Sequence, residues 1–532
     1  MIKNIKWLLF ASLTLVACNN DDDTTTEEPV SPGTADFSKY VALGDSFAAG
    51  FSDGALFRTA QTTSYPAILA MQLSAAGGGL FTIPYMNDDF GGLLYGGNII
   101  QGTRLYFGKT ANSDFDEPLS APGTPTTEVT SHLPAGNTYS NLGIPGAKCI
   151  DLVKGGYGNP SPASIVGKIS SPYYARFASS PSTTVMADAL VQNPTFFSLW
   201  IGGNDVLGYA LAGGDATVNP LTPSAGAVGV GFDASYDELI TNLTAGGRKG
   251  VVANLPYVTD LPQFTYLTPS FVDTYKYYTD GDEKLKSRVV SAGDIATINQ
   301  VNNILGFLDY ALTSGAGQAN RINVLSSATG AKNPVLIKDE TLTDYGAVIT
   351  AYASGSGDPT LMALASYLGA TFGKVRQTAT GDLIPLVSSS VIGTAATLPP
   401  GVPSSLGKYG ITYPLEDKHV LIPSEIAEIN DATNAYNIKI KAVADSKPDQ
   451  IAFVDAKAIM GQLTTGGISD SDYTLTSEFV LGGAFSLDGI HPSPRGYALI
   501  ANKFIDKINE KFGSTLRKVN IGTYRTLFPS AL

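Results

Sequence analysis

The chain has 532 residues and a formal net charge of −13, and only 15% of its residues are charged. This acidic balance argues against binding to nucleic acid or to anionic lipid through charge. After residue 18, no apolar run is long enough to cross a membrane as a helix.

The first 18 residues have the pattern of an export signal. Lys3 and Lys6 precede an apolar run over residues 7–17, which has the length of a signal-peptide core and is too short to span a bilayer. The run ends in Leu-Val-Ala-Cys, which resembles the lipobox of bacterial lipoproteins; the resemblance implies that Cys18 is lipidated. We predict a lipoprotein signal peptide over residues 1–17. The alternative is an ordinary signal peptide followed by an unrelated cysteine.

The segment after the signal is polar and acidic, and we predict a disordered tether over residues 18–37. Its acidic start resembles the surface-export signal of Bacteroidota lipoproteins. We therefore expect an exported protein that a lipid anchors to the outer membrane, on its surface or periplasmic side. The only other cysteine is Cys149, so a lipidated Cys18 excludes a disulfide within one mature chain.

Four short apolar runs, each ending in a polar or glycine-rich turn, predict buried strands of a mostly parallel α/β sheet. They cover residues 40–43, 196–201, 250–253 and 451–454. Apolar stripes at helical spacing predict two helices, over residues 424–445 and 494–511. Ser493 is suited to cap the second helix, because Pro494 follows it at the first helical position.

Two stretches between these elements predict insertions on one catalytic domain that covers residues 38–515. The insertions cover about residues 77–138 and 265–420, and residues 516–532 form a C-terminal extension. The second insertion has a helical pattern near residues 295–312 and a strand pattern near 335–338. A separate inserted subdomain is the alternative for it.

The sequence Gly-Asp-Ser at the end of the first predicted strand places Ser46 where functional groups gather in a parallel sheet. The alternative is a helix cap, since aspartate and serine both cap helices well. A serine nucleophile also needs a base that takes its proton. Only three histidines, His132, His419 and His491, are present to supply one.

His491 is the strongest candidate for the base. Asp488 lies three residues before it, and in a tight turn its carboxylate can accept from one ring nitrogen while the other nitrogen faces Ser46. His132 and His419 lie in no such setting, and we interpret them as surface loop residues.

Acyl transfer also needs hydrogen-bond donors for the oxyanion of the tetrahedral intermediate. Asn204, in Ile-Gly-Gly-Asn-Asp after a predicted strand, offers a side-chain amide, and Gly143, in Asn-Leu-Gly-Ile-Pro-Gly, offers a backbone N–H. For each segment alone a structural turn is the alternative. The chain has no Gly-x-Ser-x-Gly elbow and no motif for a metal, and we expect no cofactor.

Four segments in this order resemble the SGNH or GDSL hydrolase family, which is named for its serine, glycine, asparagine and histidine blocks. The segments are ALGDSFAAGFSDG, NLGIPGA, IGGND and DGIHPSPRGYALIA. The resemblance covers about residues 38–76, 138–152, 194–264 and 421–512. It implies a three-layer α/β/α, flavodoxin-like fold with a mostly parallel central sheet, and it leaves both insertions unmatched.

The resemblance also implies a role for each matching residue. Ser46 would be the nucleophile, His491 the general base and acid, and Asp488 the residue that orients His491. The oxyanion donors would be the N–H groups of Ser46 and Gly143 and the side chain of Asn204.

Three positions beside these residues have implied structural roles. Asp45 and Asp205 would fix turns. Phe47 departs from the aliphatic residue common after the serine, and this difference should affect packing rather than chemistry.

These residues predict an esterase or lipase that cleaves carboxylic esters, of lipids or acylated glycans, through an acyl-serine intermediate. One alternative is an esterase that deacetylates polysaccharide. Another is a surface lipoprotein that only binds. The tyrosine-rich residues 264–280 either line a sugar or acyl site or pack within the fold.

Overall fold

The computed structural model describes residues 29–109, 115–133, 138–267, 276–279, 282–287, 292–326 and 333–532. The predicted signal peptide and Cys18 lie outside these residues. Among the described residues, no helix has the length and apolar character needed to cross a membrane.

A five-stranded parallel sheet forms the centre of the molecule. Its strands are β1 (Tyr40–Gly44), β6 (Asn141–Gly143), β7 (Phe196–Trp200), β8 (Lys249–Ala253) and β13 (Ile451–Val454). Their order in space is β6-β1-β7-β8-β13, and every neighbouring pair is parallel. Renumbered along the chain this is the doubly wound order 2-1-3-4-5, in which the strand order reverses beside β1.

The four predicted strands are all present, and β6 is the strand that the sequence pattern missed. β6 has only three residues and ends in glycine, so it lacks the apolar run that revealed the others. All three of its residues are nevertheless buried. Its pairing with β1 places its carboxyl end beside that of β1.

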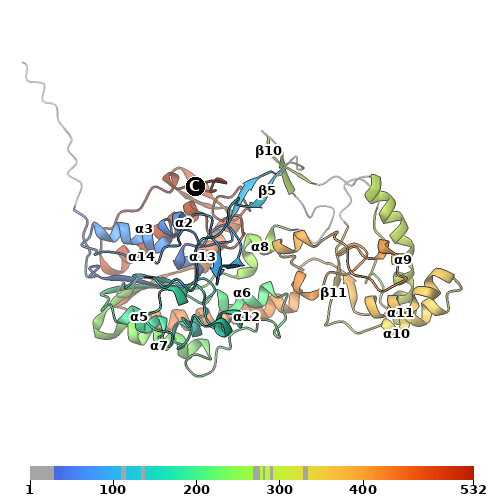
Figure 1. Ribbon diagram of the computed structural model, residues 1–532, viewed down its shortest axis with the longest axis horizontal. Helices are drawn as coiled ribbons and strands as arrows, with labels where there is room; N and C mark the ends of the chain where they lie inside the picture. The colour runs from blue at the N-terminus through green and yellow to red at the C-terminus, as the bar shows by residue number, and fades with distance from the viewer. Residues whose placement is uncertain are drawn as a thin grey trace, which may run out of the picture.

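Helices cover both faces of the sheet, as Figure 1 shows. One face carries α3 (Tyr65–Ser74), α13 (Ala456–Thr465) and α14 (Pro494–Phe512), and the other carries α5 (Val185–Leu190), α6 (Asn204–Leu211), α7 (Phe232–Thr244) and α12 (Pro423–Asp445). The two helices predicted from their stripes are α12 and α14. Ser493 caps α14 by accepting from the N–H of Gly496 at 3.0 Å, as predicted.

The predicted tether is shorter than expected. Phe37 is 1% exposed and its ring meets that of Phe196 edge-on at 4.9 Å. The backbone of Thr34 donates to the carbonyl of Phe512 at 2.8 Å. The chain is thus packed on the central α/β layers from about residue 31, because the few apolar residues at the end of the acidic segment reach their core.

The first insertion packs against the segment that follows β1. It contains β2 (Leu93–Tyr95), β3 (Asn98–Gln101), β4 (Leu105–Gly108) and β5 (Phe115–Ser120), and α1 (Ser46–Ala49) and α2 (Arg58–Thr62) precede it. The C-terminal extension returns to this region. The guanidinium of Arg104, which is 1% exposed, donates to the carbonyl of Pro529 at 2.7 Å, and Phe528 packs edge-on against Phe57.

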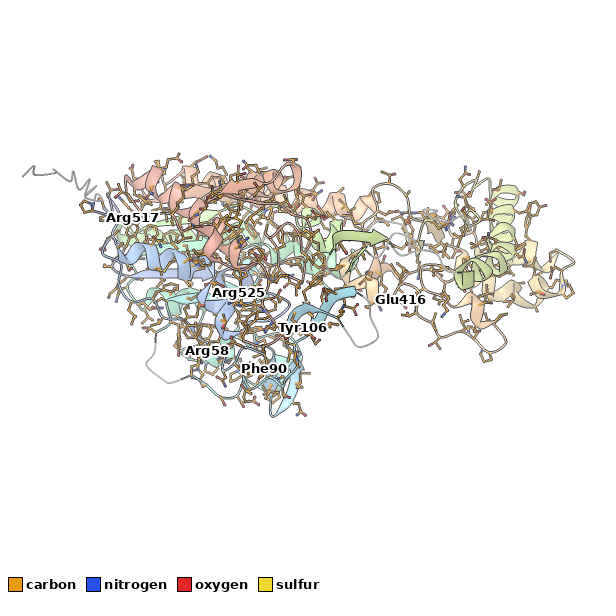
Figure 2. All side chains as sticks on the ribbon, turned by 90° about the horizontal axis from the view of Figure 1, so that it is seen from above. Arg58, Phe90, Tyr106, Glu416, Arg517 and Arg525 are labelled. Carbon is orange, nitrogen blue, oxygen red and sulfur yellow. The ribbon has the colours of Figure 1, made fainter. Side chains whose placement is uncertain are left out.

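The second insertion forms a lobe beside the central α/β layers, at the right of Figure 1. It contains β9 (Lys276–Thr279), β10 (Asp282–Ser287), α9 (Ala292–Ala316), β11 (Leu336–Lys338), α10 (Gly346–Ser354), α11 (Pro359–Phe372) and β12 (Val375–Gln377). A hydrophobic core of its own, made by residues between 301 and 406, holds the lobe together. Figure 2 shows Glu416 where the chain returns from the lobe towards α12.

An antiparallel sheet joins the two insertions, and no pattern in the sequence predicts it. Its strand order is β10-β9-β5-β4, and Asp116 of the first insertion pairs with Tyr278 of the second. The remaining short elements are α4 (Pro162–Val166), α8 (Pro262–Thr265), β14 (Ile468–Asp470) and β15 (Tyr473–Leu475).

Candidate active site

Ser46 occupies the first position of α1, directly after β1. Asp45 caps this short helix by accepting from the N–H of Phe47 at 2.9 Å, and Gly50 ends it at φ 85°. Burial raises the pKa of Asp45 to about 6, which fits its structural role. The N–H of Ser46 has no acceptor among the described residues and lies at the positive end of a helical turn.

The three predicted catalytic side chains form one hydrogen-bonded relay. Ser46 Oγ lies 2.8 Å from His491 Nε2, and His491 Nδ1 lies 2.9 Å from Asp488 Oδ2. Because a carboxylate only accepts, Nδ1 carries the proton and leaves Nε2 free to accept from the serine hydroxyl. His491 is 8% exposed, so the relay is largely shielded from water.

Asp488 is held in its ionised form. Burial alone would raise the pKa of this carboxyl, but the imidazole of His491 and the N–H groups of His491 and Ile490 lower it to about 2. These two N–H groups donate at 2.8 and 2.9 Å to Oδ1, and the N–H of Gly54 donates at 2.9 Å to Oδ2. The carboxylate therefore remains a fixed acceptor for His491 at neutral pH.

The turn at residues 52–55 positions the loop that carries Asp488 and His491. The N–H of Asp53 donates to Ser486 Oγ at 3.0 Å, and Asp53 Oδ1 accepts from the N–H of Leu487 at 2.9 Å. Burial raises the pKa of Asp53 to about 7, and its backbone adopts φ 52°. Sequence reasoning missed this role, although Ser-Asp-Gly after the serine block indicates a turn.

Two aromatic rings pack against the imidazole of His491. The ring of Phe51 lies 4.6 Å from it and the ring of Phe47 lies 5.4 Å from it, between centroids. Phe47 also meets Trp200 edge-on at 5.1 Å. The prediction that Phe47 affects packing is confirmed, and the group that it packs against includes the base itself.

The predicted role of Gly143 in the oxyanion site is wrong. Its N–H donates to Asn141 Oδ1 at 2.9 Å and is therefore already engaged. A side chain at this position would place a Cβ 2.2 Å from the backbone nitrogen of Ala49. Gly143 is needed because α1 packs directly against β6, and the small residues Ala48 and Ala49 serve the same close approach.

Gly146 replaces Gly143 as the candidate backbone donor. It follows Pro145 in the turn after β6, with φ 82°, and the N–H of Ala147 closes that turn on Ile144 at 3.0 Å. Proline followed by a residue at positive φ is typical of a type II turn. The exposed N–H of Gly146 has no acceptor in the described parts of the chain.

Asn204 lies at the start of α6, directly after the strand beside β1. One hydrogen of its amide donates to the carbonyl of Ala147 at 3.0 Å, in the turn that holds Gly146. This contact orients the amide and leaves its second hydrogen without an acceptor within the described ranges. Ser46, Gly146 and Asn204 thus supply three donors at the carboxyl ends of three adjacent strands.

The other predicted positions lie outside the relay. His132 is exposed and its ring nitrogens contact the carbonyls of Leu133 and Ala178 at 2.8 and 2.9 Å. His419 is half-buried in a 3₁₀ turn. Asp205 accepts from the N–H of Cys149 at 2.8 Å, so its structural role is confirmed.

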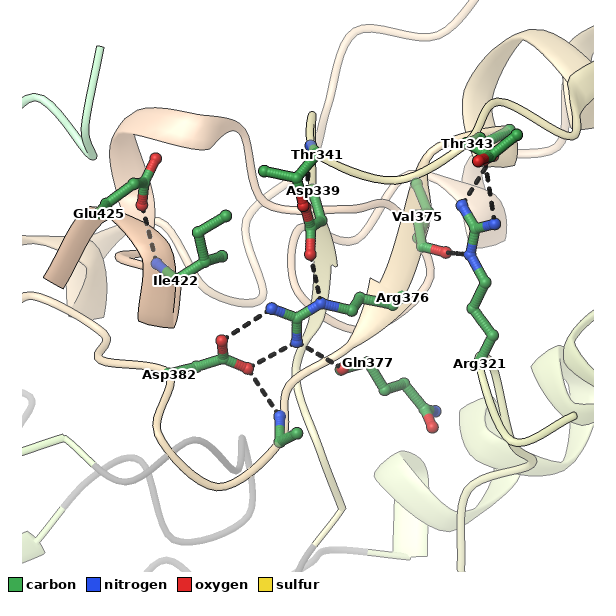
Figure 3. Close-up of polar contacts among 12 residues, drawn as sticks. Arg321, Asp339, Thr341, Thr343, Val375, Arg376, Gln377, Asp382, Ile422 and Glu425 are labelled. Carbon is green, nitrogen blue, oxygen red and sulfur yellow. Dashed lines mark hydrogen bonds and ion pairs between the residues drawn. The ribbon is translucent and has the colours of Figure 1, made fainter. Parts of the chain in front are cut away.

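One acidic group approaches the spacing of metal ligands. Oxygen atoms of Glu340, Asp417 and Glu425 lie within 4.8 Å of one another where the lobe joins α12. Burial raises the pKa of Asp417 to about 7 and that of Glu425 to about 8. Glu425 also accepts from the N–H of Ile422 at 2.8 Å, as Figure 3 shows, so part of the cluster already serves as a helix cap.

A cleft of about 590 Å³ opens beside the relay. Asp488 and Ile490 line it on the relay side, and both insertions line its other walls. A second, smaller cavity of about 50 Å³ lies behind Phe47 and Trp200 and is lined by apolar residues. Comparisons with protein-family models, curated proteins and solved structures found no match to this chain.

Proposed function

We propose that this protein is a serine hydrolase of the SGNH or GDSL type that cleaves carboxylic esters through an acyl-Ser46 intermediate. The observation that carries the proposal is the relay from Ser46 through His491 to Asp488, with distances of 2.8 and 2.9 Å. A protein that only binds a ligand has no need of a nucleophile, a base and an orienting carboxylate in this geometry.

The first half of the reaction acylates the serine. Ser46 Oγ forms a bond to the ester carbonyl carbon while its proton passes to His491 Nε2. The carbonyl oxygen becomes an oxyanion, for which the free N–H groups of Ser46 and Gly146 and the amide of Asn204 are donors. The carbon–oxygen bond to the alcohol then breaks, and the proton on Nε2 leaves with the alcohol.

The second half releases the acid. Water gives a proton to His491 Nε2 as its oxygen bonds to the acyl carbon. Collapse of this second tetrahedral intermediate breaks the bond to Ser46 Oγ, which recovers its proton from Nε2. Asp488 stays ionised throughout and stabilises the imidazolium in both halves.

Export and lipid anchoring belong to the same proposal. The lipobox-like sequence that ends at Cys18 supports lipid attachment to the outer membrane. The folded part of the chain begins near residue 31, and the proposed acidic tether would link it to the lipid. The hydrolase would then act on esters that reach the bacterial envelope or surface.

The test is hydrolysis of p-nitrophenyl esters by the purified protein and by two variants. The wild type should release p-nitrophenol, and Ser46→Ala should lose about 10³-fold or more in kcat while keeping its fold by circular dichroism. His419→Ala is the matched control and should retain activity. No hydrolysis by the wild type, or hydrolysis unchanged in Ser46→Ala, would refute the proposal.

A further inference from the structure

We propose that the cleft between the two insertions binds the apolar chain of the substrate ester, so that the enzyme selects long-chain, uncharged esters over acetyl esters. This inference rests on the proposed function and adds the class of substrate. It is carried by the walls of the cleft, its charge and its position beside the relay.

The walls of the cleft are mainly apolar and come from distant parts of the chain. Leu105 and Phe107 lie on β4 of the first insertion, whereas Leu386 and Val387 lie in a 3₁₀ turn of the second. A volume of about 590 Å³ falls within the range of pockets that enclose a small organic ligand. An acetyl group would leave most of these walls uncovered.

The loop at Phe479 and Val480 adds a rigid side to the cleft. The ring of Phe479 lies 4.8 Å from that of Tyr266, and both rings line the cleft. Val480 has φ 65°, a conformation that costs energy for a β-branched residue and persists only where the surrounding structure enforces it. Backbone strain of this kind tends to occur at ligand sites, and here the strained residue, Val480, lines the cleft.

The charged residues of the cleft disfavour anionic substrates. Asp116, Glu117 and Asp488 line it, and among the described residues the lining includes no lysine or arginine. A fatty ester is uncharged and meets no repulsion there. A substrate with phosphate or carboxylate groups inside the cleft would meet these three carboxylates, which repel negative charge.

Gln263 supplies a polar group at the relay end. Its side chain is 2% exposed and lines the cleft, and its N–H donates to the carbonyl of Gly489, next to Asp488, at 2.9 Å. Its amide nitrogen has no hydrogen-bond partner among the described residues. A buried donor without an acceptor is unfavourable, and a turn of this amide towards an oxygen of the bound ester would satisfy it.

The experiment compares kcat/KM for two series of uncharged esters. One series varies the acyl chain from acetate to decanoate with p-nitrophenol as the alcohol. The other varies the alcohol of alkyl acetates over the same lengths. A rise of about threefold or more for each added methylene is expected in one series, and that series identifies which side of the ester enters the cleft.

Two valines give a matched pair of variants. Val387 is 57% exposed and lines the cleft, whereas Val324 is 56% exposed, lies in the same lobe and is not part of the lining. Val387→Asp should lower the ratio of decanoate to acetate hydrolysis at least tenfold, and Val324→Asp should leave the ratio unchanged. Gln263→Leu should raise KM about fivefold without lowering the melting temperature.

The outcomes separate this inference from the proposed function. Hydrolysis of acetate that depends on Ser46 but shows no dependence on chain length in either series would overturn the cleft assignment alone. An equal effect of Val387→Asp and Val324→Asp would also overturn it. Absence of any hydrolysis that depends on Ser46 would instead refute the proposed function.

Discussion

The central α/β layers and the inserted lobe each contain a buried network of charged side chains, and the two networks differ in their last hydrogen-bond partner. In the lobe, each nitrogen of the Arg376 guanidinium donates to an acceptor: Asp339, Asp382 or the carbonyl of Gln377 (Figure 3). In the central α/β layers, Asp488 and His491 are similarly fixed by hydrogen bonds. Here the chain of hydrogen bonds ends at the Ser46 hydroxyl, near N–H groups that have no acceptor among the described residues.

Under the proposed function, the network around Arg376 stabilises the lobe, whereas the network at Ser46 carries out the reaction. The carboxylates around Arg376 are 4% exposed and closely paired, so the network ties β11 and β12 together and has nothing to offer a ligand. In the relay at Ser46, the serine hydroxyl and the accepting nitrogen of His491 have no hydrogen-bond partner but each other among the described residues. Variants in the two regions should therefore act on different properties.

The largest expected effect follows the loss of the base. His491→Ala should lower kcat by about 10⁴-fold, because no other described side chain makes a hydrogen bond to the Ser46 hydroxyl and could take its proton. Steady-state hydrolysis of an ester measures it, and circular dichroism checks the fold. His132→Ala is the control; an equal loss there would contradict the assignment of the base.

The corresponding substitution in the lobe, Arg376→Met, should lower the free energy of unfolding. Arg376→Met leaves the buried carboxylates of Asp339 and Asp382 without a cation, which typically costs about 3–5 kcal/mol. Trp200 lies in the hydrophobic core of the central α/β layers and is the only tryptophan after residue 7. In urea, circular dichroism should therefore show the lobe of Arg376→Met unfolding earlier, while Trp200 fluorescence changes near the wild-type midpoint.

Two outcomes of the urea experiment would contradict this difference between the two networks. Unfolding of Arg376→Met at the wild-type urea concentration by both signals would mean that the network adds no stability. If circular dichroism and Trp200 fluorescence both change at a lower urea concentration than in the wild type, the lobe and the central α/β layers unfold as one unit.

A smaller effect on turnover is expected at the oxyanion donors. Asn204→Ala removes one donor and should lower kcat by about 10²- to 10³-fold. The loss should appear in kcat, since the interaction forms mainly in the transition state. An increase in KM at unchanged kcat would show that Asn204 binds the ground state instead.

The smallest effect concerns the pH dependence of stability. The pKa of Asp53 is about 7 in the fold against an ordinary value of 3.8. Its favourable contribution is fully present below pH 3.8 and is lost as the pH rises through 7, at about 1.4 kcal/mol per pH unit between the two values. Asp53→Asn keeps an acceptor for the N–H of Leu487 but cannot ionise.

Urea unfolding at pH 5 and pH 8 measures this contribution. Between these conditions the wild type should lose more free energy of unfolding than Asp53→Asn. Equal losses in the two proteins would show that Asp53 does not titrate in this range.

The sequence predicted the parts of the site that local patterns determine. Ser46 follows an apolar strand, and Asp488 and His491 share one turn, so their places required only strand ends and a three-residue spacing. The direction of the Gly143 N–H could not be predicted, because it depends on the side chain of Asn141 accepting that N–H.

The walls of the cleft depend on contacts between residues far apart in the chain. The pairing of β5 with β9 joins segments more than 150 residues apart, and neither strand has a distinctive apolar pattern. The end of the tether was missed for a related reason. Only a few residues, among them Ala35 and Phe37, enter the core, and composition over a window does not reveal such anchors.

Covalent labelling of the nucleophile tests the central claim most directly. A fluorophosphonate reacts with a serine only where a base activates it. Mass spectrometry of the full-length protein after such labelling should show one adduct, on the peptide that contains Ser46, and His491→Ala should prevent it. A wild-type protein that remains unlabelled, or an adduct on another serine, would contradict the account.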